Sequence, residues 1–129
     1  MERILAFLQE AGVFYLATVD GDQPRLRPLG LCFEKDGHIC FGVGDHKAVY
    51  RQLRENPRTE IVASRPDGHW LRYTGKAVFD PTLEEAALTA APDLRNIYNA
   101  QTGHTLCVFY LEDASAVVIP VAGEGERLL

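Results

Sequence analysis

Apolar residues follow a helical spacing at the start of the chain and a strand-like spacing after it. Ile4, Phe7 and Leu8 fall on one helix face and Gly12 follows them, which predicts a helix over residues 2–11. Further along, runs rich in β-branched and aromatic residues are separated by short turns containing Gly and Asp, a pattern typical of antiparallel strands. These runs cover residues 13–19, 25–33, 38–43, 58–64, 69–79, 105–111 and 115–121.

Two helices are predicted to interrupt the strands. Asp45 is expected to cap the first, which ends before Pro57. Thr82 and Glu85 have the T-x-x-E spacing of a capping box, which predicts the second helix over 83–91.

Strand–turn–strand connections dominate this order of elements, so a doubly wound parallel sheet is excluded as the main interpretation. We expect a mainly β protein with helices (α+β), built as a small antiparallel barrel with helices at its ends. Gly75 inside a strand predicts a bulge or a close approach, and the Gly-containing tail after Val121 is expected to be poorly ordered.

Composition and charge narrow the class of protein. The chain has 129 residues, which predicts a single domain over 1–129, and its 47% hydrophobic and 24% charged content is typical of a globular protein. The net charge of −5 argues against a general nucleic-acid binder. No signal peptide or membrane span is predicted, and three cysteines without CxxC spacing indicate reduced thiols and a cytoplasmic location.

Two arginines stand at the start of one predicted strand. Residues two apart share a face of a strand, so Arg25 and Arg27 point the same way, and Leu29 continues that face. They are either solvated edge residues that guard a strand, or ligands of an anion. Pro28 removes a backbone donor and indicates an edge or irregular position.

Two other segments add basic and aromatic side chains. Lys47 falls in the first turn of the predicted helix, where the helix dipole disfavours a cation but free N–H groups suit a phosphate. Trp70 and Arg72 share a strand face and together suit an aromatic ring carrying an anionic group, although a tryptophan alone is most often a core residue.

The segments "QPRLRPLG", "GHICFGVGDHKAVYRQLRENPRTEIVA" and "HWLRYTGKAVF" resemble the pyridoxamine 5'-phosphate oxidase-like, FMN-binding split-barrel family, most closely its short single-domain members. The resemblance runs from about Ile4 to Ile119 and implies a six-stranded split barrel that forms a homodimer, with FMN at the subunit interface. It also implies which residues line the cofactor, Trp70 and Arg72 doing so from the partner subunit. The set is Arg25, Arg27, Pro28, Leu29, Phe41, Gly42, His46, Lys47, Trp70 and Arg72.

The resemblance implies a flavin-dependent oxidoreductase acting on a small organic substrate, with electrons from NAD(P)H. The cofactor carries the redox step, and a cation such as Arg27 or Arg72 would stabilise the reduced flavin. Members of the family often carry a threonine where this chain has Gly42 and an arginine where it has His46. A deazaflavin remains an alternative cofactor, because it presents a phosphate and a tricyclic ring as FMN does. A carrier, sensor or interaction module, with or without a cofactor, remains an alternative function.

No catalytic residue is assigned from the sequence. Tyr98 is a candidate for facing a substrate, with a packed structural role as the alternative. The four histidines show no HxH or HxxxH pairing, which predicts no metal site.

Overall fold

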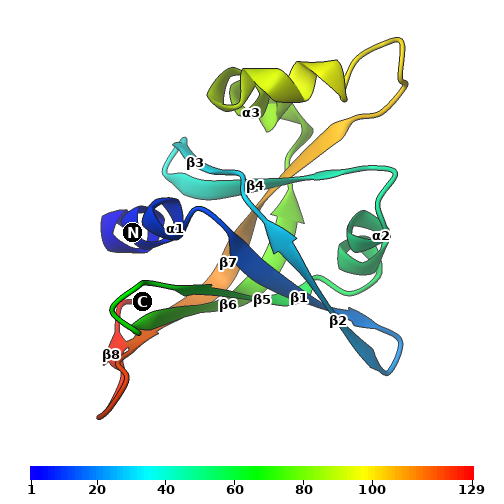
Figure 1. The fold of residues 1–129 in the computed structure, drawn as a ribbon. Coiled ribbons are helices and arrows are strands. Elements are labelled where there is room, and N and C mark those ends of the chain that lie inside the picture. Colours follow the sequence, from blue (N-terminus) through cyan, green and yellow to red (C-terminus); the bar gives the residue numbers. More distant parts are fainter.

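The computed structural model describes residues 1–129 and shows strands wrapped around a core, with helices at the margins (Figure 1). The helical elements are α1 (Glu2–Ala11), α2 (Ala48–Glu55), α3 (Glu84–Ala90) and two 3-10 turns, η1 (Pro81–Leu83) and η2 (Pro92–Asn96). The strands are β1 (Phe14–Asp20), β2 (Gln23–Leu29), β3 (Cys32–Lys35), β4 (His38–Gly44), β5 (Arg58–Ser64), β6 (Trp70–Phe79), β7 (Leu106–Ile119) and β8 (Glu126–Arg127).

All strands belong to one antiparallel sheet of eight strands with the order β2-β1-β5-β6-β7-β4-β3, and β8 pairs with β7. The two ends of this order, β2 and β3, are consecutive in the chain and joined only by Gly30 and Leu31. Because so short a link cannot span an open sheet, the sheet must curl until its edges meet. The α+β antiparallel barrel expected from the sequence is confirmed, with eight strands in place of six.

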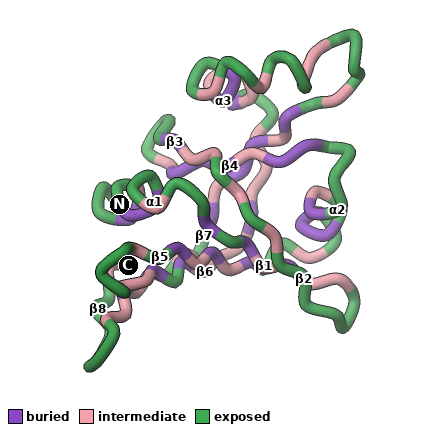
Figure 2. The backbone as a smooth tube through the Cα atoms, in the orientation of Figure 1, coloured by how far each residue is buried: buried purple, intermediate pink, exposed green.

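The barrel interior is filled by alternate residues of the strands and by the apolar faces of α1 and α2. Phe41 is fully buried at its centre, with the rings of Phe14 and Phe109 at centroid distances of 5.7 and 5.5 Å. Helix α1 adds Ile4 and Leu8, which are also fully buried. Buried positions follow the strands on the inward side, while hairpin tips and outer helix faces are exposed (Figure 2).

Several predicted strand limits differ from the structure. The run 25–33 divides into β2 and β3, because the chain leaves β1 after Leu29 and joins β4 from Cys32. The runs 105–111 and 115–121 form one strand, β7, which continues through Asp113 with a positive φ of 51°. The predicted irregularity at Gly75 is confirmed: the register shifts there, and an added Cβ would lie 2.9 Å from the Glu112 carbonyl oxygen.

The predicted caps are wrong, and the tail lacks regular structure at its glycines but pairs beyond them. Helix α2 has Lys47 at its N-cap, and the Asp45 carboxylate instead accepts from the Thr105 backbone N–H at 3.1 Å. The capping box does not form, because Thr82 donates to Asp80. The C-terminal tail is paired, since β8 joins β7 and Glu126 forms an ion pair with an α1 arginine. None of the helices combines the length and apolar character needed to cross a membrane.

Candidate functional site

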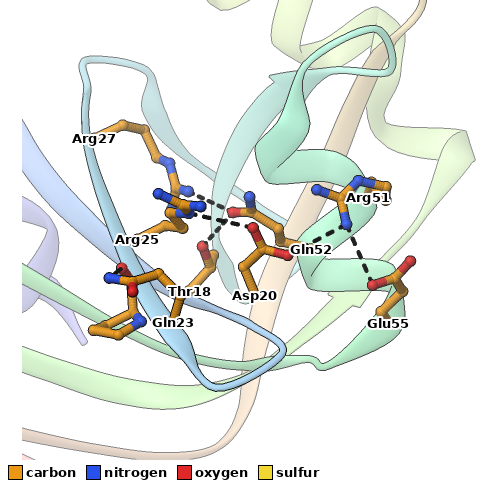
Figure 3. A network of polar contacts seen from close by, with 9 residues as sticks. Thr18, Asp20, Gln23, Arg25, Arg27, Arg51, Gln52 and Glu55 are labelled. Atoms are coloured by element: carbon orange, nitrogen blue, oxygen red, sulfur yellow. Dashed lines mark hydrogen bonds and ion pairs between the residues drawn. The ribbon is translucent and has the colours of Figure 1, made fainter.

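Arg27 lies on the inward face of β2, directly opposite Leu16 of β1. Its guanidinium donates to the Leu16 carbonyl at 3.0 Å. It also donates to Gln52 Oε1 of α2 at 2.6 Å (Figure 3). Gln52 is buried, and the same oxygen accepts from the Thr18 hydroxyl at 2.6 Å. Both acceptors of Arg27 are neutral, and no carboxylate lies within ion-pair distance. Burial, followed by the charge of Arg25, lowers the pKa of Arg27, so its environment favours an added anion.

Arg25 has the same orientation but a different electrostatic environment. Its Nε lies 3.2 Å from Asp20 Oδ2, and the other oxygen of that carboxylate lies 3.5 Å from Arg51 (Figure 3). The carboxylate of Asp20 therefore offsets the positive charges of Arg25 and Arg51. Of the two arginines predicted from the sequence, only Arg27 keeps an uncompensated charge.

The backbone of β2 has a free edge beside these side chains. Strand β2 pairs only with β1, so every second residue presents its polar backbone groups away from the sheet. Pro24 and Pro28 cannot donate to the ladder, which places their nitrogens on that free side. Leu26 has the same parity as these prolines, so its N–H also points away from β1.

A second free edge lies at the end of β4. Strand β3 pairs with β4 only as far as Phe41, so residues 42–44 pair with β7 alone. Gly42 contacts a cavity of about 420 Å³ that is also lined by Gly30, Leu31 and Tyr98. The barrel is therefore split between β2 and the end of β4, on either side of the two-residue link.

The N-terminus of α2 follows the end of β4. Lys47 is its N-cap in extended conformation, and no side chain caps the first N–H groups of the helix. The Lys47 side chain is exposed and makes no ion pair. The helix therefore begins with free donors and a free ammonium group, an arrangement that suits a phosphate.

His46 precedes this N-cap and is part of a small polar cluster. Its ring stacks on His104 with a centroid distance of 3.9 Å, and its Nδ1 lies 3.8 Å from Asp45 Oδ1. Gly44 is covered by the His46 ring and the Tyr98 hydroxyl, both 2.7 Å from where a Cβ would stand. A side chain at residue 44 would displace this cluster.

The other predicted cofactor residues on β2 and β4 have varied surroundings. Leu29 is half-buried against the core, and Pro28 is exposed on the outer side. Phe41 is fully buried, so its side chain serves the core and offers no surface to a ligand.

Trp70 and Arg72 lie on the outer face of β6, away from the residues around α2. The Arg72 guanidinium stacks over the Trp70 ring at 4.9 Å, and its Nε lies 3.5 Å from Glu60 Oε1. Arg72 is opposite Val62, which is opposite Tyr15. Within one chain, this outer group does not meet Arg27 or the start of α2.

Two residues that contact the predicted site residues, Gln52 and His104, were not themselves predicted from the sequence. The sequence contains a sign of the role of Gln52, because a polar glutamine lies on the apolar face of the predicted helix and a buried amide needs a hydrogen-bond partner. The sequence contains no sign that His104 contacts His46. The two residues are far apart in the sequence and meet only through the pairing of β4 with β7.

An antiparallel barrel, split between β2 and β4 and with cations beside the split, defines a split-barrel protein. A family model described as pyridoxamine 5'-phosphate oxidase matches residues 1–118. The chain therefore belongs to the pyridoxamine 5'-phosphate oxidase family, as the resemblance implied. No curated protein matches the sequence.

Solved structures agree with this assignment. A NimC/NimA family protein from Clostridium acetobutylicum is 38% identical with a TM-score of 0.90, over 99% of this chain and 90% of that one. Two more distant structures share the fold alone. One is a FAD-binding protein from Mesorhizobium loti, with 16% identity and a TM-score of 0.62, over 88% of this chain and 91% of that one. The other is a heme binding protein from Mycobacterium smegmatis, with 17% identity and a TM-score of 0.68, over 94% of this chain and 57% of that one.

Proposed function

We propose that the protein binds FMN at the split in its barrel and acts as a flavin-dependent oxidoreductase on a small organic substrate, with electrons from NAD(P)H. The observation that carries the proposal is the uncompensated guanidinium of Arg27, held in place by two neutral acceptors. A fixed, partly buried cation without a counter-ion is stabilised by an anionic ligand.

The residues around the split fit the phosphate of such a cofactor. Arg27 is bonded to Gln52, five residues after Lys47, which is a separation of about 7.5 Å along a helix axis. The uncapped N–H groups of α2 lie at the start of this helix, beside Lys47. These groups provide two cations and free backbone donors between the start of α2 and Gln52, a set that suits a doubly charged phosphate.

The free edges of β2 and β4 are the places where the chain would contact the flat ring system of the flavin. The Leu26 N–H on the edge of β2 would donate to a polar atom of the ring, and the ring would lie beside the cavity that Gly42 lines. When bound, the flavin would supply the redox chemistry itself. The chain would hold and orient it, and Arg27 would stabilise negative charge on it.

We also propose that the protein is a homodimer, because large apolar side chains are exposed on the outer sheet face. Leu26 is 68% exposed and Tyr15 is 45% exposed on neighbouring strands of this face, near Trp70 and Arg72. Exposed apolar side chains gathered on a sheet face favour association with a second copy. Such a dimer would let Trp70 and Arg72 of one copy approach the cofactor of the other. The free thiols agree with a cytoplasmic location.

The test is the affinity of the purified protein for FMN, measured by quenching of flavin fluorescence. Arg27→Ala and Lys47→Ala should each weaken binding by about 10- to 100-fold, the value of one charge-assisted hydrogen bond. Arg58→Ala is the matched control, because it removes an exposed arginine that makes no ion pair. A wild-type protein that takes up no FMN would refute the proposal, and unchanged affinity in both variants would refute the site.

A non-catalytic role as a flavin carrier or sensor is the second candidate, because the residues proposed to hold the flavin would bind it whether or not it turns over. Anaerobic addition of NADPH or NADH separates the two. Bleaching of the bound flavin within seconds supports a reductase, and an oxidised spectrum that persists supports a passive binder. Binding of heme in place of FMN would assign the split to a different cofactor.

A further inference from the structure

Asp45, His46 and His104 come together beside the N-terminus of α2. Asp45 and His46 lie in the short connection between β4 and α2, and His104 lies just before β7. One ligand atom from each residue falls within 4.8 Å of the others. This grouping arises from the tertiary fold, so the absence of paired histidines in the sequence gave no sign of it.

The backbone of the two connections is fixed independently of the histidine rings. The Asp45 N–H donates to the Thr105 carbonyl at 3.0 Å, and the Thr105 N–H donates to Asp45 Oδ1 at 3.1 Å. This reciprocal pair extends the β4–β7 ladder by one step. The positions from which His46 and His104 project are therefore held by the sheet, and Asp45 Oδ2 remains free to bind a ligand.

Both imidazoles have unused ring nitrogens. His46 and His104 stack at a centroid distance of 3.9 Å with an interplanar angle of 19°, and neither ring makes a hydrogen bond to the protein. His69 differs, because it belongs to a separate turn where its only acidic neighbour is Asp67, at 3.3 Å. The cluster at Asp45 thus joins two imidazoles and one carboxylate, whereas His69 offers a single imidazole.

We propose that Asp45, His46 and His104 bind a divalent transition-metal ion of the zinc type. Two neutral imidazoles and one carboxylate are ligands that such ions prefer, and three protein ligands leave at least one position open. Because nearly parallel rings do not aim at one point, one imidazole must rotate on binding, as exposed side chains do readily. The Tyr98 hydroxyl lies near the His46 ring, because both cover Gly44.

The proposed metal site and the proposed phosphate site share one residue, and each has a residue of its own. His46 is shared with the proposed phosphate site, whereas His104 belongs to the metal site alone. Lys47 belongs to the phosphate site alone. His104→Ala should therefore lose the metal and keep FMN, and Lys47→Ala should do the reverse. This double comparison separates a failure of one proposal from a failure of the other.

The experiment is a calorimetric titration of the purified, metal-free 129-residue protein with Zn²⁺, repeated with Co²⁺ and followed by visible absorbance. The wild type should bind a single equivalent of Zn²⁺. His46→Ala and His104→Ala should each weaken binding by about 10-fold or more. His69→Ala is the matched control and should bind as the wild type does. Circular dichroism of each variant checks that the substitutions leave the fold intact.

Cysteine is the competing ligand to exclude. Burial raises the pKa of Cys32 and of Cys40 to about 11, so both stay protonated at neutral pH and are poor ligands. Cys107 is half-buried near Asp45, and Cys107→Ser should leave the Co²⁺ spectrum unchanged. The proposal is overturned if the wild type binds no metal, if His104→Ala binds as tightly as the wild type, or if His69→Ala or Cys107→Ser loses the ion equally.

Discussion

The guanidinium of Arg27 and the side-chain oxygen of Gln52 lie 2.6 Å apart, and this contact joins the edge strand of the barrel to helix α2. Gln52 keeps Arg27 in one orientation without cancelling its charge. A glutamate in the same place would hold the arginine equally well and neutralise it. The choice of an amide over a carboxylate therefore determines whether the arginine can still attract an anion.

Gln52→Glu should reduce FMN affinity by about 10-fold or more while leaving the melting temperature close to that of the wild type, because the hydrogen bonds from Thr18 and Arg27 survive. Flavin titration and thermal denaturation measure the two quantities. Gln9→Glu adds the same charge on the exposed side of α1 and should change neither. Equal FMN affinity in Gln52→Glu would mean that the charge of Arg27 plays no part in binding.

Gly44→Ala should impair ligand binding and lower stability by about 1–3 kcal/mol, because its Cβ would press on the His46 ring and the Tyr98 hydroxyl. Gly30→Ala is the control for stability, since the nearest atom to its Cβ is the Gly12 carbonyl oxygen at 3.6 Å. Urea denaturation of both variants and FMN titration of Gly44→Ala against the wild type provide the comparison. A Gly44→Ala protein that is as stable as Gly30→Ala and binds FMN as the wild type does would contradict this packing argument.

Leu26→Lys should shift the protein from dimer to monomer, because it places a charge on the exposed apolar face of the sheet. Sedimentation velocity at several protein concentrations measures the change. Val121→Lys is the matched control: Val121 is 76% exposed but lies outside the sheet, and its replacement should leave the dimer intact. A wild type that sediments as a monomer at all concentrations would exclude the homodimer.

Alkaline pH should destabilise the protein through its buried thiols. Burial raises the pKa of Cys32 and of Cys40 from the usual 9 to about 11, so the folded state holds these protons more tightly than the unfolded state. The resulting stability is fully present below pH 9 and is lost as the pH rises through 11. Urea unfolding across this range should show a smaller decline for Cys40→Ala than for the wild type. Identical slopes would show that Cys40 makes no contribution.

Local patterns predicted most of the secondary structure. Helix α1 over 2–11, strand β5 over 58–64 and the irregularity at Gly75 all agree with the structure, because each is determined by spacing or by one glycine. The division of the run 25–33 was not predictable in this way. It depends on strand β2 leaving β1 to close the barrel, which is a property of the whole sheet.

The candidate site was predictable only in part. The order of basic motifs identified the family, and Arg27 and Lys47 are in fact free of counter-ions. The compensation of Arg25 by Asp20 could not be read from spacing alone, since it depends on how tightly the β1–β2 hairpin folds. The contact of His46 with His104 depends on the pairing of β4 with β7.

Strand β7 is the last long element of the chain, and it lies between β6 and β4. It pairs with β4, for example Cys40 with Tyr110, so most of the protein must be synthesised before the β4–β7 ladder can form. Until then, β4 and β6 each carry an exposed edge able to pair with other chains. The barrel is therefore expected to complete its fold only after β7 has been translated, and a chain that stalls before β7 would be a target for aggregation or for chaperones.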